Sequence, residues 1–149
     1  MALKQLELLV QVQKQREEKL QAQFVQAQQF LLQQQQKYQG LADYRIDYIR
    51  QTQQKGADGI YSRQFNQYLN FITKLDQALE QQNIHIQQAQ RVVDQRRNAW
   101  MAMQKKRKAI EQLISKEHEK LQFKAMRQEQ KLSDEVAMQL FIRRLAHAS

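Results

Sequence analysis

The chain has 149 residues, a formal net charge of +9, no proline, no cysteine and only three glycines. Proline breaks helix interiors and glycine weakens them by about 1 kcal/mol, so this composition predicts long helices with few turns. The absence of cysteine excludes disulfides, a thiolate nucleophile and cysteine-based zinc sites. No stretch approaches the ~20 apolar residues of a membrane span, and the N-terminus lacks a signal-peptide pattern, so we expect a cytoplasmic location.

The first predicted helix runs from about residue 2 to about residue 54. With Leu3 as heptad position a, ten of the 14 a and d positions up to Tyr48 are apolar. An apolar repeat of 3.5 residues that continues over seven heptads is typical of supercoiled helices. This segment is therefore expected to pack along a second helix.

A turn is predicted at about residues 55–61, because Gly56 and Gly59 can adopt the positive φ angles that end a helix and reverse the chain. A second helix is predicted from about residue 62. Its heptad frame starts at Phe65, and 13 of the 17 a and d positions up to Leu121 are apolar. The turn favours antiparallel packing of the two helices.

An antiparallel register follows if the turn is centred near residue 57. Residues whose numbers sum to 113 then face each other, such as Leu41 opposite Ile72. The same register places Glu17 opposite Arg96, which gives a buried acid a base as its partner. Heptads alone leave a parallel homodimer open, and they do not distinguish a monomer from a dimer.

The expected fold is all-α: a long antiparallel two-helix coiled-coil hairpin over residues 1–121 with a C-terminal helical extension over 122–149. The heptad repeat decays after Leu121, and a new amphipathic segment follows at residues 136–145. Because the extension has no partner helix in the hairpin, we expect it to be frayed or ordered by a partner protein.

A more specific arrangement surrounds the predicted turn. It reads DYxxxY at residues 43–48, GI at 59–60 and YxxFI at 68–72. In these motifs and in its periodicity, the chain resembles the flagellar export protein FliJ family. The resemblance implies a non-enzymatic stalk and adaptor of the flagellar type III export apparatus. Such a protein binds the export ATPase ring (FliI-like) and the export gate (FlhA-like), assists export chaperones, and lies at the inner face of the cell membrane.

The resemblance also implies a binding surface for the export gate. The corresponding residues are Lys37, Leu41, Tyr44, Tyr48, Phe71, Leu75, Ala78 and Gln82. All eight occupy g or d heptad positions, so they form one strip beside the seam; Lys37 and Gln82 differ from the family's residue type. Exposed aromatic residues outside the a and d positions often mark binding sites, although Tyr44 and Phe71 could instead widen the seam.

Basic residues are concentrated in residues 61–110, which carry nine Lys and Arg against three Asp and Glu. The candidate residues for binding the ATPase or another acidic surface are Arg91, Arg96, Arg97, Lys105, Lys106, Arg107 and Lys108. A solvated helix face is the simpler explanation. No nucleic-acid partner is expected, because apart from Trp100 no aromatic residues alternate with these charges.

No catalytic, cofactor-binding or metal-binding residues are predicted. The three histidines are far apart in the sequence, and no glycine-rich phosphate loop or nucleophile elbow is present. Two alternative functions remain open: the coiled-coil stalk of a non-flagellar type III secretion system, and a basic coiled coil that binds nucleic acid.

Overall fold

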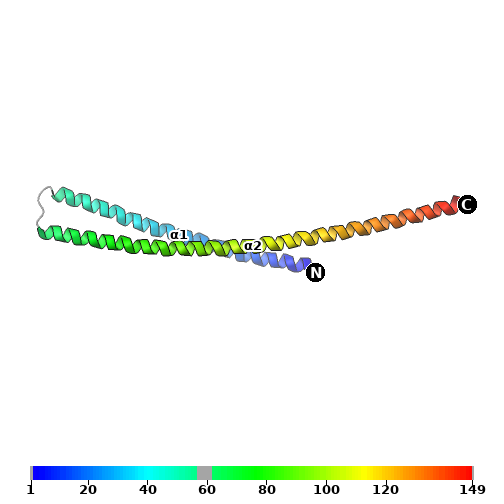
Figure 1. Cartoon of the computed structure of the whole chain (residues 1–149), viewed down its shortest axis with the longest axis horizontal. Coiled ribbons are helices and arrows are strands. Elements are labelled where there is room, and N and C mark those ends of the chain that lie inside the picture. The colour runs from blue at the N-terminus through cyan, green and yellow to red at the C-terminus, as the bar shows by residue number, and fades with distance from the viewer. Residues whose placement is uncertain (1, 57–61, 149) are drawn as a thin grey trace. The chain divides into compact units, whose positions relative to one another are not determined.

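A computed structural model of the chain describes residues 2–56 and 62–148. It contains two helices, α1 (Ala2–Gly56) and α2 (Ser62–Ala148), shown in Figure 1. The two helices pack against each other, which confirms the predicted all-α helical hairpin. Most of the predicted turn, including Gly59, lies outside the described residues. Neither helix contains a stretch long and apolar enough to span a membrane within the described ranges.

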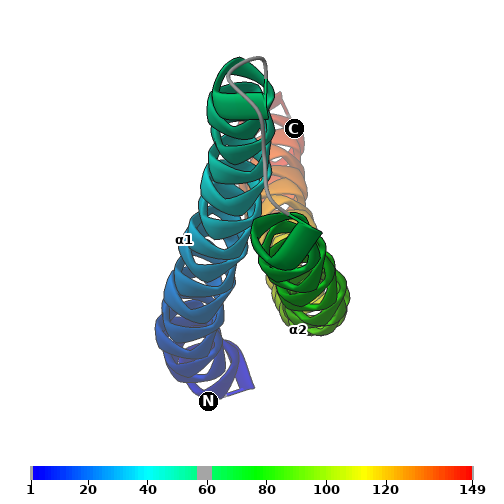
Figure 2. The ribbon, with the colours of Figure 1, turned by 90° about the vertical axis from the view of Figure 1, so that its left-hand side faces the viewer.

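The chain divides into two compact units: one formed by Arg16–Ala102, and one formed by Met1–Gln15 with Met103–Ser149. Within Arg16–Ala102, α1 and α2 run side by side in opposite directions (Figures 1 and 2). Contacts between the two helices recur along this unit, from Phe24 to Tyr48 on α1. We call the line of contact the seam.

The core of the Arg16–Ala102 unit lies on the predicted heptad positions. Phe24, Ala27 and Val93 form a buried cluster, and Leu31 and Trp100 pack against it. The rings of Phe24 and Trp100 stack with their centroids 5.6 Å apart. All five residues occupy a or d positions, so the predicted apolar stripes are the surfaces that meet.

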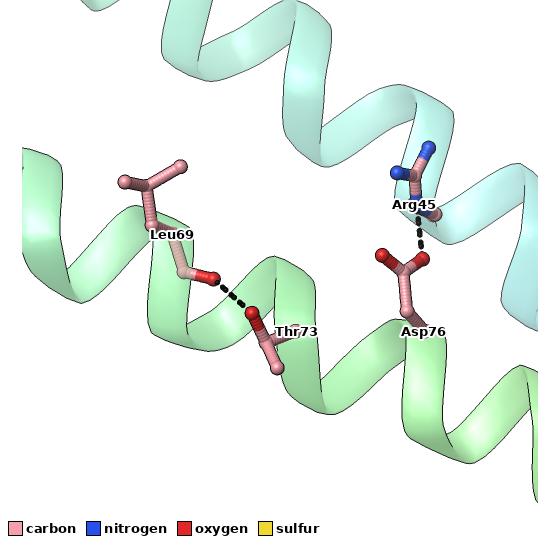
Figure 3. Close-up of polar contacts among 4 residues, drawn as sticks. All are labelled: Arg45, Leu69, Thr73 and Asp76. Atoms are coloured by element: carbon pink, nitrogen blue, oxygen red, sulfur yellow. Dashed lines mark hydrogen bonds and ion pairs between the residues drawn. The ribbon is translucent and has the colours of Figure 1, made fainter.

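Polar contacts also cross the same seam. Gln34 is buried, and the Gln82 side chain donates from Nε2 to the Gln34 backbone carbonyl at 2.9 Å and to its Oε1 at 2.8 Å. Arg45 donates from Nε to Oδ1 of Asp76 at 2.7 Å, as Figure 3 shows. Gln34, at a core d position, and Arg45, at a core a position, therefore each meet a polar partner on the other helix. Figure 3 also shows the Thr73 hydroxyl donating within α2 to the Leu69 carbonyl at 2.9 Å.

The observed register differs from the predicted one. The cross-helix pairs are Arg45–Asp76, Gln34–Gln82 and Phe24–Trp100, whose residue numbers sum to 121, 116 and 124. These sums lie around 120, one heptad from the predicted 113. Arg96 accordingly donates to Oε1 of Gln23 at 3.3 Å, about two turns of α1 from the predicted Glu17.

The predicted register is wrong because the heptad repeat leaves it undetermined. Sliding one helix by a heptad, about 10.5 Å, again places each a position opposite a d position. The midpoint of the turn therefore decides the register. Since α1 continues to Gly56 and α2 starts at Ser62, that midpoint is residue 59 rather than residue 57.

In the other unit, Val10 and Gln13 on α1 are buried, and Ile110 and Ile114 on α2 are half-buried. From residue 121 to residue 148, every residue of α2 is exposed. The exposed large apolar residues there are Leu121, Phe123, Met126, Leu132, Val136, Met138, Leu140, Phe141, Ile142 and Leu145. The extension forms the last part of α2, which is helical as far as Ala148. Its ordering by a partner stays a prediction.

Candidate functional site

Aromatic residues from both helices meet at the end of the seam nearest the turn. Tyr48 on α1 contacts Phe71 and Tyr68 on α2, with ring centroids 4.4 Å and 5.6 Å apart. Tyr44 meets the edge of Phe71 at 6.2 Å, and Phe65 lies 6.2 Å from Tyr68. We call these five residues the aromatic cluster. It is the largest group of aromatic contacts among the described residues.

The exposure of the aromatic cluster follows from the heptad positions of its members. Tyr48, Phe65 and Tyr68 occupy a or d positions, whereas Tyr44 and Phe71 occupy g positions beside the seam. Two helices cover rings at g positions only in part, because no third element packs over that flank within the described structure; Phe71 is half-buried against Tyr48. Tyr44 is accordingly 53% exposed, and Phe65 near the helix end is 48% exposed. The cluster therefore offers apolar area to a partner.

The remaining residues of the predicted gate strip have different environments. Leu75 is buried in the seam, Leu41 is half-buried in the seam, and Ala78 is half-buried beside it. Lys37 is exposed, and Gln82 is held by its hydrogen bonds to Gln34. The structure thus brings Tyr44, Tyr48 and Phe71, the three aromatic residues of the strip, into direct contact. Gate binding by the strip stays a prediction.

Phe65 and Tyr68 extend the surface beyond the predicted strip. Sequence reasoning assigned both to the seam because they occupy a and d positions. In the structure, both line a shallow apolar hollow of ≈ 150 Å³ together with Thr52, Gln53 and Gly56. This exposure could be predicted from the sequence, because core positions within one heptad of a helix end have neighbouring core residues on only one side.

Three of the predicted basic residues, Arg91, Arg96 and Arg97, lie in the Arg16–Ala102 unit, and two of them make contacts within the hairpin. Arg97 lies over the Phe24 ring at 5.4 Å and contacts Asp94 at 3.4 Å. Arg96 donates to Gln23, and Arg91 is exposed. A guanidinium packed over an aromatic ring covers apolar surface as well as carrying charge. Arg91 is thus the most available of the three cations.

The other predicted basic residues lie in the second unit. Lys105, Lys106 and Lys108 are exposed. Arg107 is half-buried and donates from Nη1 to both carboxylate oxygens of Glu111 at 3.0 Å. These three exposed lysines lie within four residues, and their hydrated ammonium groups can attract an acidic protein surface. Their binding to the export ATPase stays a prediction.

The described residues contain no group of three or more His, Asp or Glu side chains placed to hold a metal ion. The hollows within the Arg16–Ala102 unit are shallow and lie beside the seam. The two-helix unit therefore provides an extended surface that suits contacts with proteins.

A model of the family described as Flagellar FliJ protein matches residues 2–146. The match includes both compact units and the aromatic cluster. Comparisons with curated proteins and with solved structures gave no match.

Proposed function

The chain belongs to the flagellar FliJ protein family, a non-enzymatic group with a role in flagellar protein export, and from this premise we propose that it is a stalk and adaptor of the export apparatus. The turn end of the hairpin binds the export gate protein (FlhA-like). The basic residues bind the export ATPase ring (FliI-like), and the protein assists export chaperones. Through these partners it is associated with the inner face of the cell membrane.

The observation that carries the proposal is the exposure of the aromatic cluster. Tyr44 leaves 53% of its surface in water although its ring contacts Phe71 at 6.2 Å. Aromatic side chains supply much of the binding energy at protein interfaces, because they bury a large area and lose little conformational entropy. Rings held in place by ring contacts need little reordering when a partner covers them.

The electrostatic part of the proposal rests on Lys105, Lys106 and Lys108, which are exposed side chains on α2. Exposed lysines act mainly through long-range attraction, which speeds association and weakens as salt is added. Replacing all three with glutamine should slow association with the ATPase ring and flatten its salt dependence. An unchanged association rate at low salt would contradict this assignment.

The gate proposal is tested by titrating the full chain against the soluble cytoplasmic domain of the export gate protein, using isothermal calorimetry. Tyr44→Ala should weaken binding about tenfold or more, as expected for an interface aromatic residue. The matched control is Ile46→Ala, which removes a side chain that is 47% exposed at a b position of the same helix.

The control should stay within about twofold of the unmodified chain, since most surface substitutions have small effects. Circular dichroism should show the same helicity for both variants. Equal gate affinities for Tyr44→Ala and Ile46→Ala would contradict the proposed surface. A large loss of helicity in Tyr44→Ala would instead assign this ring to the packing of the hairpin.

A further inference from the structure

The two flanks of the seam differ in charge within Arg16–Ala102. In an antiparallel helix pair the g and c positions of both helices share one flank, and the e and b positions share the other. The charged residues on the g/c flank are Arg16, Lys19, Lys37, Lys74 and Asp47. Those on the e/b flank are Glu18, Asp76, Glu80, Asp94 and Arg97. Four cations against one acid give the g/c flank +3, and the reversed count gives the e/b flank −3.

The g/c flank also contains a groove in the middle of the unit. It measures ≈ 380 Å³ and is lined by Gln23, Gln26, Ala27, Phe30, Val92 and Arg96. Gln23 and Phe30 on α1 and Val92 on α2 all occupy g positions, so the structure places the g positions of both helices on one flank as the heptads require.

The apolar residues of the groove are exposed. Phe30 is 53% exposed and Val92 is 42% exposed. The e positions at the same level of the hairpin are polar, at Gln28 and Gln35 on α1 and at Asn83 and Gln90 on α2. Exposed apolar side chains occur on the e/b flank as well, at Val25 and Leu32, but these occupy b positions farther from the seam. Phe30 and Val92 occupy g positions that border the seam and line one groove there.

We propose that this groove is a docking site for an amphipathic helix of a partner protein, with acidic residues on both sides of its apolar stripe. A helix can lie along the groove between two packed helices and bury an apolar face against Phe30 and Val92. The cations that border this part of the flank are Arg16, Lys19, Lys37 and Arg96. Acidic residues beside the stripe match these cations.

The chemistry of the groove favours a helix over nucleic acid. A phosphate backbone satisfies the cations but leaves Phe30 and Val92 in water, and one exposed aromatic ring does not form a stacking platform for bases. The site is also separate from the aromatic cluster, because Phe30 lies two heptads, about 21 Å, from Tyr44 along α1. The docking site therefore does not depend on gate binding.

The test uses two designed 21-residue peptides as probes. Both carry leucine at a and d positions; one carries glutamate at the flanking e and g positions, and the other carries lysine there. Fluorescence anisotropy with the full chain at low salt should show binding of the glutamate peptide and at least about tenfold weaker binding of the lysine peptide. Added salt should weaken the glutamate complex, because the attraction is screened.

Two variants locate the site. Phe30→Ala should weaken the glutamate peptide about tenfold, as expected for an anchoring aromatic residue. Leu32→Ala is the matched control, since Leu32 is 54% exposed but occupies a b position on the opposite flank. It should leave the affinity within about twofold. Tyr44→Ala should leave it unchanged, so failure of gate binding and failure of this inference are distinguishable.

Several outcomes would overturn the inference. Equal affinities for the two peptides would show that the charges on the flank do not select the partner. Equal effects of Phe30→Ala and Leu32→Ala would show that the peptide does not bind in the groove. Displacement of the peptide by an equimolar 20-bp DNA duplex would assign the flank to nucleic acid. Self-association in sedimentation velocity that Phe30→Ala abolishes would show that a second copy of the chain covers it.

Discussion

The contact between Gln34 and Gln82 is the polar pair whose removal has the clearest expected effect on stability. Gln34 is 7% exposed, and its Oε1 accepts from Gln82 Nε2 at 2.8 Å. Gln82→Leu removes the donor and leaves a buried acceptor without a partner, which costs ~1–3 kcal/mol. The leucine recovers part of this through added apolar burial, so we expect a net loss of about 1–2 kcal/mol in the free energy of unfolding.

The double variant Gln34→Leu with Gln82→Leu should behave differently. Replacing both partners with apolar side chains leaves no unpaired acceptor, so the double variant should be at least as stable as the unmodified chain. About 1 kcal/mol corresponds to a shift of roughly 2–4 °C in Tm for a chain of this size. Gln82→Leu should thus melt a few degrees lower, and the double variant should regain this loss.

The measurement is urea and thermal unfolding followed by far-UV circular dichroism. Gln81→Leu is the control, since Gln81 is the exposed neighbour of Gln82 and its replacement should change stability by less than about 0.5 kcal/mol. The reasoning is refuted if Gln82→Leu is as stable as Gln81→Leu. It is also refuted if the double variant is less stable than Gln82→Leu alone.

Three further predictions concern other parts of the chain. Asp76→Asn should lower the free energy of unfolding by ~0.2–1 kcal/mol at low salt and by less in 1 M NaCl, because its ion pair with Arg45 is partly exposed; urea unfolding giving equal losses at both salts would contradict this. Trp100→Phe should cost less than about 1.5 kcal/mol, because Trp100 Nε1 is buried without a hydrogen-bond partner among the described residues and the substitution retains an aromatic ring against Phe24; a larger loss in denaturant titration would show that this N–H is bonded. A chain ending at residue 131 should keep its Tm, since every residue from 121 to 148 is exposed; a drop of more than about 5 °C would show that the extension stabilises the hairpin.

The positions that form the seam were predictable from the sequence. On α1, every a and d position from Leu3 to Tyr48 except Tyr38 is buried or half-buried in the structure. This success follows from the 3.5-residue repeat, which fixes the face of each helix that must leave water. The partners of Gln34 and Arg45 were not predictable, because they depend on the register and the repeat allows several registers.

The candidate site was predictable where it depends on the face of the helix alone. The g positions of Tyr44 and Phe71 indicated that the two rings share a flank, and they do meet at 6.2 Å. The groove at Phe30 and Val92 was not predicted, although both residues also occupy g positions. That these two side chains line one groove depends on the register, so the heptad frames alone did not place them together.

The exposed extension has a consequence for how its helix forms. A separate peptide covering residues 121–148 would be only marginally helical in water, because starting a helix fixes three residues for a single hydrogen bond. In the chain, the packed part of α2 already supplies that nucleus, and the extension only has to propagate it. Amide hydrogen exchange should therefore quicken gradually toward Ala148 instead of changing at one boundary. A partner that binds any part of this segment therefore does not have to nucleate the helix.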